Sequence, residues 1–406
     1  MRDNQKAPQI RFSGFEKEYE KKQFDSVFDF ISNNTLSRDN LNYHGGSTQN
    51  VHYGDILTKF GEYIDAEKEI LPFLNDEEVA LKYQNATLKD GDIIIADTAE
   101  DAMVGKCSEI GNIGDKKIIS GLHTIPCRTK VKYASKYMGY YLNSEAYHHK
   151  LLPLMQGVKV IAISKSGIQG TELCLSQDYD EQKKIGEFFF AIDEKIKYEK
   201  QKLDAIKMLK KSMLTKMFPR EGQSKPEIRF AGFNEAWEQR KVSELCSIST
   251  GKSNTQDKVE DGEYPFYVRS PIIERSTKYL YDEEAVLTVG DGVGTGKVFH
   301  YVNGKYDLHQ RCYRMYDFTD ELNAHYFYHT FSKLFYKRVM AMTAKTSVDS
   351  VRLEMIADME IPAPKIEEQV KIGTYFDNLD NLITLHQREL EKLENVKSAC
   401  MKSMFV

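Results

Sequence analysis

The sequence lacks the features that mark secreted, membrane-spanning and zinc-binding proteins. Its six cysteines stand apart from one another, at Cys107, Cys127, Cys174, Cys246, Cys312 and Cys400. No C-x-x-C pair occurs, so neither a zinc ribbon nor a disulfide framework is expected. No stretch approaches ~18 uncharged apolar residues, which argues against a membrane span, and the N-terminal MRDNQKAPQI has no apolar core of the kind a secretory signal needs. We therefore expect a reduced, cytoplasmic protein without membrane contact.

Signatures of catalysis are also scarce. The chain contains no Pro-Pro, whereas an amino-methyltransferase acting on adenine or cytosine needs a Pro-Pro-Tyr-type turn, and no Pro-Asp begins a nuclease-type carboxylate cluster. An unrecognised metal site among the many Asp, Glu and Lys residues stays open. His309 precedes Cys312 by three residues, and His123 precedes Cys127 by four. A nucleophilic Cys–His pair is one interpretation, but a hydrogen-bonded histidine beside a core cysteine is the favoured one.

A positive charge excess is missing as well. The formal net charge is −5, which excludes a protein that coats nucleic acid through its overall charge, although local basic patches stay open. At 41% hydrophobic and 29% charged residues, the chain has an ordinary globular composition. Its 406 residues suggest two or three domains.

One glycine-rich segment, TVGDGVGTGKV at residues 288–298, resembles a phosphate-binding loop at first sight. A P-loop requires Gly, four residues and then Gly-Lys-Ser/Thr. Here Val298 follows Gly296 and Lys297, and Asp291 stands at the first position. We interpret the segment as the connection of a β-hairpin.

The sequence contains the same pattern twice. PQIRFSGFEKEYEKK at residues 8–22 returns as PEIRFAGFNEAWEQR at 226–240, an offset of 218, and EQKKIGEFF at 181–189 returns as EQVKIGTYF at 368–376, an offset of 187. Such a repeat predicts two tandem halves, roughly 8–218 and 226–405. FPREGQSKP at 218–226 joins them, and its prolines and small polar residues mark a boundary.

Between these landmarks each half keeps the same order of features. An apolar strand is followed by Asp97 or Asp291, a loop that ends in Gly-Lys, and then His123 or His309. A lysine follows the histidine by 36 residues in both halves. We expect strands at Ile93–Ala96, Lys116–Ile119, Ala285–Val289 and Lys297–Tyr301.

Each half ends in a long helix. Apolar residues recur at steps of three and four over 181–218 and at the matching positions of the second copy. A helix of 38 residues would be about 57 Å long and cannot bury its own apolar stripe. Each helix would either pack on its own domain or, as we favour, pair antiparallel with its repeat in a coiled-coil-like rod.

Two tyrosine-rich stretches, SKYMGYYLNSEAYHHKLL and AHYFYHTFSKLFYKRV, have helical spacing. They would either lie on nucleic acid through aromatic and basic side chains or pack their rings into the core, which is the favoured interpretation.

The order PxIRFxGF, EQxKIGxFF and KMF returns in the second half with Tyr375 and Ser403 at one position each of the last two motifs. Together with GLH and GVKVIAISKSGI in the first half, this order resembles the specificity subunits of Type I restriction-modification systems. The resemblance covers the whole chain. It implies an α+β fold in which two pseudo-symmetric globular target-recognition domains are joined by two long antiparallel helices. The expected segments are recognition domains at 1–178 and 221–364 and helical spacers at 179–220 and 365–406.

The resemblance further implies a non-enzymatic subunit that reads an asymmetric, bipartite target in double-stranded DNA. It would direct two adenine-N6 methyltransferase subunits, and through them restriction subunits, to that target. S-adenosylmethionine, ATP and magnesium would belong to the partners, and this chain would hold no cofactor. The rival hypotheses are a stand-alone DNA nuclease or modifying enzyme with an unrecognised site, and a coiled-coil protein scaffold.

The predicted contacts rest on residue chemistry, because recognition domains vary within the family. Exposed lysines meet phosphates, and an arginine can read guanine. The predicted DNA contacts are Lys106, Lys159, Lys165, Lys252, Lys297, Lys345 and Arg352. The predicted partner contacts, within the helical stripe, are Phe189, Ile196, Phe376 and Ile383.

Overall fold

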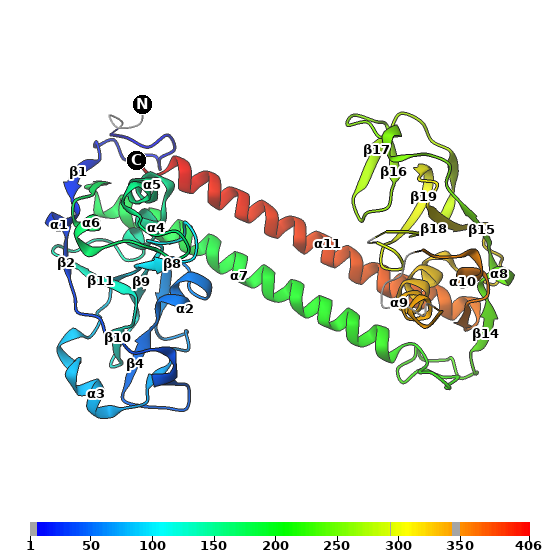
Figure 1. Cartoon of the computed structure of the whole chain (residues 1–406), viewed down its shortest axis with the longest axis horizontal. Coiled ribbons are helices and arrows are strands. Elements are labelled where there is room, and N and C mark those ends of the chain that lie inside the picture. Colours follow the sequence, from blue (N-terminus) through cyan, green and yellow to red (C-terminus); the bar gives the residue numbers. More distant parts are fainter. Residues whose placement is uncertain (1–5, 293, 343–349) are drawn as a thin grey trace. The chain divides into compact units, whose positions relative to one another are not determined.

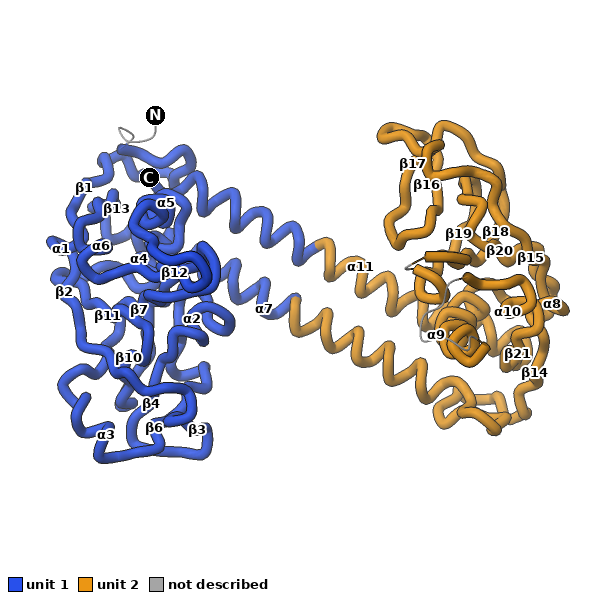
Figure 2. The backbone as a smooth tube through the Cα atoms, in the orientation of Figure 1, with its two compact units in different colours: residues 1–199, 389–406 blue, residues 200–388 orange. Residues whose placement is uncertain are grey.

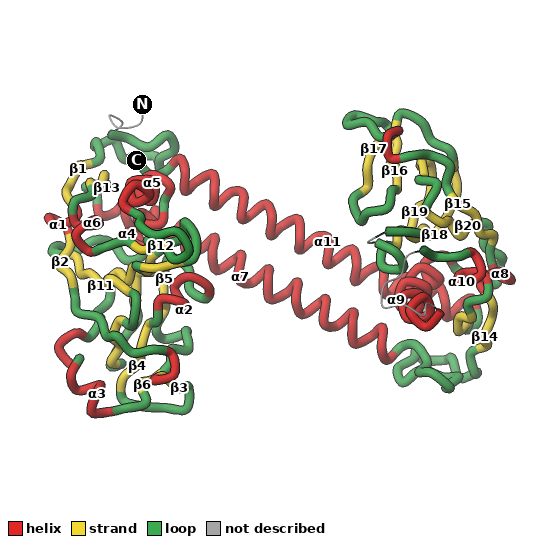
Figure 3. The backbone as a smooth tube through the Cα atoms, viewed as in Figure 1, coloured by secondary structure: helices red, strands yellow, loops and turns green. Residues whose placement is uncertain are grey.

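The structure is a computed structural model that describes residues 6–292, 294–342 and 350–406. It consists of two compact units: unit 1 contains Met1–Glu199 and Glu389–Val406, and unit 2 contains Lys200–Arg388 (Figure 2). Both units mix helices with sheets, which confirms the predicted α+β class (Figure 3). The division passes through both long helices, so each unit contains part of each helix. This differs from the expected division into recognition domains and separate helical spacers.

Unit 1 is built on two main sheets. The first has the strand order β2 (Phe28–Phe30), β11 (Thr124–Thr129), β7 (Ile93–Ala96), β9 (Cys107–Gly111) and β5 (Tyr63–Asp65). The second has the order β10 (Lys117–Ser120), β4 (Thr48–Val51), β6 (Phe73–Leu74) and β3 (Leu41–Asn42). Two short pairs complete the unit: β1 (Glu20–Gln23) with β13 (Glu172–Leu175), and β8 (Thr98–Ala99) with β12 (Ile161–Ala162).

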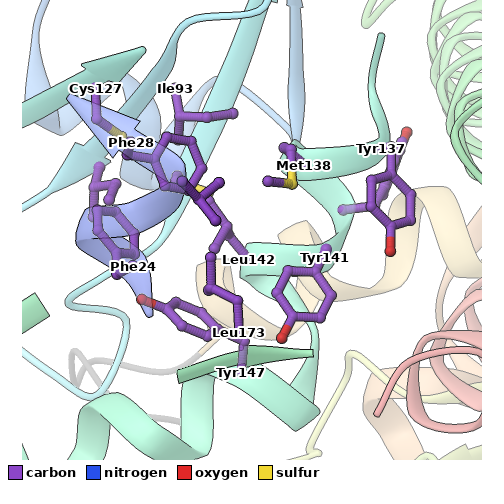
Figure 4. Close-up of a cluster of buried hydrophobic side chains, with 14 of the residues drawn as sticks. Phe24, Phe28, Ile93, Cys127, Tyr137, Met138, Tyr141, Leu142, Tyr147 and Leu173 are labelled. Carbon is purple, nitrogen blue, oxygen red and sulfur yellow. The ribbon is translucent and has the colours of Figure 1, made fainter. Parts of the chain in front are cut away.

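Short helices accompany the two sheets of unit 1. They are α1 (Phe24–Val27), α2 (Tyr53–Thr58), α3 (Glu77–Lys82), α4 (Tyr137–Asn143), α5 (Glu145–Leu151) and α6 (Lys165–Gln169). Tyr137, Tyr141 and Tyr147 of α4 and α5 lie in the apolar core with Phe24 and Phe28 (Figure 4). The first tyrosine-rich stretch is therefore a packing element, as favoured from its sequence.

Unit 2 is built on one six-stranded sheet. Its strand order is β15 (Ser247–Thr250), β20 (Cys312–Tyr316), β18 (Tyr281–Val289), β19 (Phe299–Leu308), β16 (Tyr264–Tyr267) and β17 (Ile273–Ser276). A separate antiparallel pair joins β14 (Glu238–Lys241) to β21 (Glu360–Ala363), and the shorter helices are α8 (Val242–Leu245), α9 (Ala324–Met342) and α10 (Leu353–Ala357). Helix α9, the second tyrosine-rich stretch, buries Tyr326, Phe327, Phe331 and Phe335, so it too is a packing helix.

The two long helices are α7 (Tyr179–Lys216) and α11 (Ile366–Ser403), each of 38 residues (Figure 1). In unit 1, Asp193 and Lys195 of α7 pair with Lys397 and Glu389 of α11, at N–O distances of 2.7 and 3.1 Å. Residues later in α7 therefore contact residues earlier in α11. The predicted antiparallel pairing is confirmed within this unit.

The same contacts recur in unit 2 at the repeat-related positions. Lys210 of α7 pairs with Asp380 of α11, and these residues correspond to Lys397 and Asp193 after a shift of 187. Likewise, the rings of Phe189 and Phe405 lie 5.6 Å apart in unit 1, and those of Phe376 and Phe218 lie 5.9 Å apart in unit 2. The repeat inferred from the sequence thus extends to individual contacts within each unit.

The PxIRFxGF repeat has a structural role in both units. Arg11 forms two hydrogen bonds with the carboxylate of Glu181, at 2.6 and 2.9 Å, and Arg229 forms two with Glu368, both at 2.7 Å. Both glutamate side chains are fully buried in the first turns of the long helices. Bidentate arginine–carboxylate pairs have strict geometry, so the repeated segment fixes where each long helix begins.

Candidate nucleic-acid interface

In unit 1, the loops at one end of the central strands β7 and β11 bring together residues that are distant in sequence. Asp97 follows the end of β7, and His123 immediately precedes β11. The Asp97 carboxylate lies 3.3 Å from His123 Nδ1, and the backbone N–H of Asp97 donates to the His123 carbonyl at 3.1 Å. His123 has a positive φ of 54°, an uncommon conformation for a non-glycine residue. The aspartate and the histidine of the repeated order are therefore neighbours in space.

Other polar and aromatic groups complete this loop cluster of unit 1. The ring of Tyr53 lies edge-on to that of His123, with 5.3 Å between centroids, and the Thr98 hydroxyl lies 3.3 Å from His123 Nδ1. Strand β12, paired with β8, carries a hairpin tip in which Lys159 and Val158 are exposed; Val158 is 96% accessible. The cluster thus presents an acid, a histidine, a tyrosine and a nearby lysine.

Unit 2 has its own loop cluster at the equivalent strand ends. Asp291 follows β18, and His309 follows β19. The Asp291 carboxylate lies 3.3 Å from a guanidinium nitrogen of Arg269 and 3.7 Å from Nε of Arg311. His309 is buried, and its Nδ1 accepts the backbone N–H of Arg311 at 3.0 Å. Burial, aided by the charge of Arg269, lowers the pKa of His309, so its ring is neutral at pH 7.

The glycine-rich segment forms the connection between two strands of this cluster. Strands β18 and β19 pair antiparallel, with Thr288 opposite Phe299, which confirms the predicted hairpin. At Gly290 an added Cβ would lie 2.6 Å from the Arg311 carbonyl oxygen. Glycine is therefore required here by close backbone approach, and this proximity brings Asp291 beside Arg311.

A shallow polar depression lies over the unit 2 cluster. Its lining residues are Asn254, Thr255, Gln256, Arg269, His309, Gln310 and Arg311. The side-chain amide of Gln310 donates to the side-chain oxygen of Asn254. Arginine and amide side chains are the groups that recognise base edges in a DNA groove. The depression therefore has the chemistry of a nucleic-acid contact surface.

Five of the seven predicted DNA contacts are exposed to solvent. Lys159 and Lys165 are exposed in unit 1, and Lys252, Lys297 and Arg352 are exposed in unit 2. Lys252 adjoins the unit 2 cluster, because its backbone N–H and that of Ser253 both donate to the Leu308 carbonyl. Their contact with DNA stays a prediction. Lys345 lies outside the described residues.

Lys106 requires a correction. Its Nζ donates to the carbonyl oxygens of Leu57 and Phe60, both at 3.1 Å, and burial lowers its pKa. Helix α2 leaves C-terminal carbonyls that need donors, and Lys106 supplies them. It is therefore a structural residue of unit 1 that closes the end of α2.

The predicted partner contacts differ in how far they are accessible to a partner. Phe189 and Phe376 are fully buried in the cores of their own units, so they have no surface to offer a partner. Ile196 is almost buried, with 9% of its surface accessible, whereas Ile383 is only partly buried. The apolar stripe mainly serves packing within the chain, because along it the long helices contact each other and the shorter helices of their units.

Sequence reasoning missed the arginines and amides of the unit 2 cluster. Gln310 and Arg311 directly follow His309, so their position beside the repeated histidine was an available signal. Arg269 and Asn254 carry no comparable signal, since only the tertiary fold brings the loops after β16 and β15 to this site.

The structure offers little support for chemistry at the matched cysteines. Burial raises the pKa of Cys312 to about 12 and places that of Cys127 well above its usual value. A thiol is nucleophilic as the thiolate, so neither cysteine is activated. Within residues 6–292, 294–342 and 350–406, no group of three or more His, Cys, Asp or Glu side chains is arranged to hold a metal ion. In the same ranges no helix has the length and apolar character of a membrane span.

Comparison with known proteins gives a family match that lies mainly in unit 2. Residues 234–395 match the family described as Type I restriction modification DNA specificity domain. This segment includes most of unit 2, its loop cluster and most of α11.

The whole chain has the fold of a Type I S subunit. A crystal structure of the Type-I restriction-modification system S subunit from M. genitalium has a TM-score of 0.69 and 14% identity, and it covers 98% of this chain and 99% of the other. The fold is thus similar to that of a Type I specificity subunit, the family that the repeated motifs resemble.

Two curated relatives are similar over part of their length. The Type I restriction enzyme MjaVIII specificity subunit of Methanocaldococcus jannaschii is 24% identical over 182 residues, and the EcoDI specificity subunit of Escherichia coli is 23% identical over 160 residues. These matches cover 42% and 39% of this chain, and 42% and 35% of the respective relatives. The matched region is thus less than half of each relative.

Proposed function

We propose that this chain is the DNA-recognition subunit of a Type I restriction-modification system and reads a bipartite, asymmetric target. Each unit would contact one half of the target through its loop cluster. The chain itself would have no catalytic role. It would bring its partners to the DNA in the cytoplasm.

The observation that carries this proposal is a repeated order of motifs with unlike side chains beside the matched aspartates. Asp97 faces His123, whose ring contacts Tyr53, in unit 1, whereas Asp291 faces Arg269 and Arg311 in unit 2. Equivalent positions with different donors and acceptors would favour different base pairs. An asymmetric target is the expected consequence.

The proposed partners are two adenine-N6 methyltransferase subunits and, through them, restriction subunits. S-adenosylmethionine, ATP and magnesium would be held by those partners. The long helices support this assignment, because Met208, Leu382 and Leu385 are exposed to 73%, 42% and 60% on α7 and α11. Exposed apolar groups on helices indicate a protein-binding surface.

Domain exchange tests the two-reader proposal. The chain, expressed with its methyltransferase partner, would be compared with a hybrid in which residues 241–362 come from another specificity subunit. Sequencing of methylated sites should show one half of the target altered and the other half retained. If both halves changed, or neither did, the assignment of one half to each unit would be wrong.

Two other functions are distinguished by simpler assays. A stand-alone nuclease or modifying enzyme would cleave or methylate DNA when the purified chain alone is incubated with magnesium and S-adenosylmethionine. A protein scaffold would shift no genomic fragment in a gel, with or without the methyltransferase partner. We expect a DNA shift and no covalent change from the chain alone.

A further inference from the structure

The loop cluster of unit 2 contains an arginine whose setting differs from that of an ordinary surface cation. The side chain of Arg311 is 65% exposed, yet its Nε lies 3.7 Å from the Asp291 carboxylate. Engagement through Nε leaves the two terminal nitrogens of the guanidinium on the opposite side. That pair forms the fork that can donate two parallel hydrogen bonds to one partner.

The backbone that carries Arg311 is fixed on three sides. Its N–H donates to His309 Nδ1 at 3.0 Å, and its carbonyl accepts the N–H of Gly290 at 2.8 Å. The preceding residue, Gln310, donates its backbone N–H to the Ser253 carbonyl at 2.8 Å. The point from which the Arg311 side chain leaves the backbone is therefore fixed, and the Asp291 carboxylate is the charged group beside its Nε, which favours specific recognition.

The charge arrangement also distinguishes a base contact from a phosphate contact. Asp291 lies between Arg269 and Arg311, so the three side chains together carry a charge of only +1. A carboxylate in this position opposes a phosphate, which is itself anionic. It does not oppose the edge of a base, where orientation of the donors matters more than charge.

From these contacts we infer that Arg311, aligned by Asp291, reads a guanine in the half-target bound by unit 2, by donating to the O6 and N7 acceptors in the major groove. Guanine offers two acceptors at the spacing of the arginine fork. The inference rests on the proposed function and specifies one base of that site. The matched Asp97 of unit 1 faces His123 in place of an arginine, so the same contact is not expected there.

The test uses the full chain in complex with its methyltransferase partner and a library of duplexes with random sequence. Methylated duplexes are sequenced, and the domain-exchange hybrid identifies the half-target that depends on unit 2. Arg311→Ala should reduce discrimination at one G·C position of that half by about 10- to 100-fold. The remaining positions should keep their preferences.

Arg311→Lys separates the base contact from a phosphate contact, because lysine keeps the charge and loses the fork. It should lose the guanine preference as Arg311→Ala does. The matched control is Arg220→Lys, since Arg220 is also in unit 2, is 68% exposed and pairs with Glu227 at 2.9 Å. The control should leave every base preference unchanged.

Base analogues check the atoms involved. The analogue 7-deazaguanine lacks the N7 acceptor. When it replaces guanine at the identified position, the unaltered complex should bind the duplex more weakly, whereas the Arg311→Ala complex should bind both duplexes equally. Inosine, which keeps N7 and O6, should be accepted by both.

The outcomes separate this inference from the proposed function. If the unaltered complex selects no bipartite target, the proposed function fails. If it selects one but Arg311→Lys keeps all preferences, or Arg311→Ala weakens every sequence equally, Arg311 is a phosphate contact and the inference is overturned.

Discussion

Replacing Phe218 by alanine tests whether the long helices are held by the unit cores. Phe218 is 2% exposed, and its ring centroid lies 5.8 Å from that of Tyr326, 5.9 Å from Phe376 and 6.1 Å from Trp237. Truncation of a buried phenylalanine typically costs about 3–5 kcal/mol, because packing is lost and a cavity remains. With aromatic neighbours on three sides, we expect about 4 kcal/mol for this site.

The measurement can be made specific to unit 2. Trp237 is the single tryptophan of the chain, and it lies in the unit 2 core with Phe218. Tryptophan fluorescence during thermal unfolding therefore reports on this unit. For a unit of roughly 150–250 residues, a loss of about 4 kcal/mol corresponds to a midpoint lower by about 8–16 °C.

The repeat supplies the comparison. Phe405→Ala removes the matched ring from unit 1, where it stacks on Phe189, and should leave the tryptophan transition nearly in place. Met208→Ala, at a 73% exposed position of α7, should change stability by less than about 0.5 kcal/mol. A Phe218→Ala shift no larger than that of Met208→Ala would refute the packing argument. Equal shifts for the two phenylalanines would show that the units unfold as one.

The further predictions concern four charged side chains of unit 1. Lys397→Met should cost about 3–5 kcal/mol, because it leaves two carboxylates facing each other near the helix pair. Burial raises the pKa of Glu109 to about 7 from 4.5. The free energy of unfolding should therefore fall by about 3 kcal/mol as the pH rises from about 4.5 to 7. Glu109→Gln should flatten this pH dependence, as measured by urea unfolding. Lys106→Ala should lower the free energy of unfolding by about 1–3 kcal/mol and leave the salt dependence of DNA binding unchanged. Lys159→Ala should leave the free energy of unfolding unchanged and lower the slope of log binding constant against log salt concentration by about one.

Each of these predictions would be contradicted by a specific result. The sign for Glu109 follows from proton binding: between about pH 4.5 and 7 the folded protein retains a proton that the unfolded chain has released. Parallel pH curves for the Glu109→Gln and unaltered proteins would contradict it. For Lys397, the comparison is Lys210→Met, which leaves one carboxylate, Asp380, without its cation; a larger loss there would be unexpected. If Lys106→Ala changed the salt slope, its assignment as a structural residue would be wrong.

Much of the fold follows from periodicity and repetition in the sequence. The expected strand Ile93–Ala96 coincides with β7, and both long helices have the expected length. The strand expected at Ala285–Val289 begins earlier, at Tyr281, because β19 continues to pair with it along its length. That extension depends on the partner strand, which a local pattern does not reveal.

The candidate site was predictable only in part. The repeated Asp and His residues signalled each loop cluster, since both halves keep them in the same order. Lys106, chosen as a phosphate contact, closes a helix end, and Phe189, chosen as a partner contact, is buried. The sequence alone does not show whether a lysine is exposed or bonded to a helix end, or whether a phenylalanine is on the surface or in the core, so it does not distinguish these roles.

The sequence by itself determined the duplication, the two long helices and the residues that recur in both halves, because these are periodic or repeated and need no knowledge of distant contacts. The tertiary structure decided which carboxylate faces which cation. Asp97 and Asp291 occupy matched positions, yet one meets a histidine and the other two arginines. The partners come from loops far apart in the chain, and only folding places them within a few ångströms of each other.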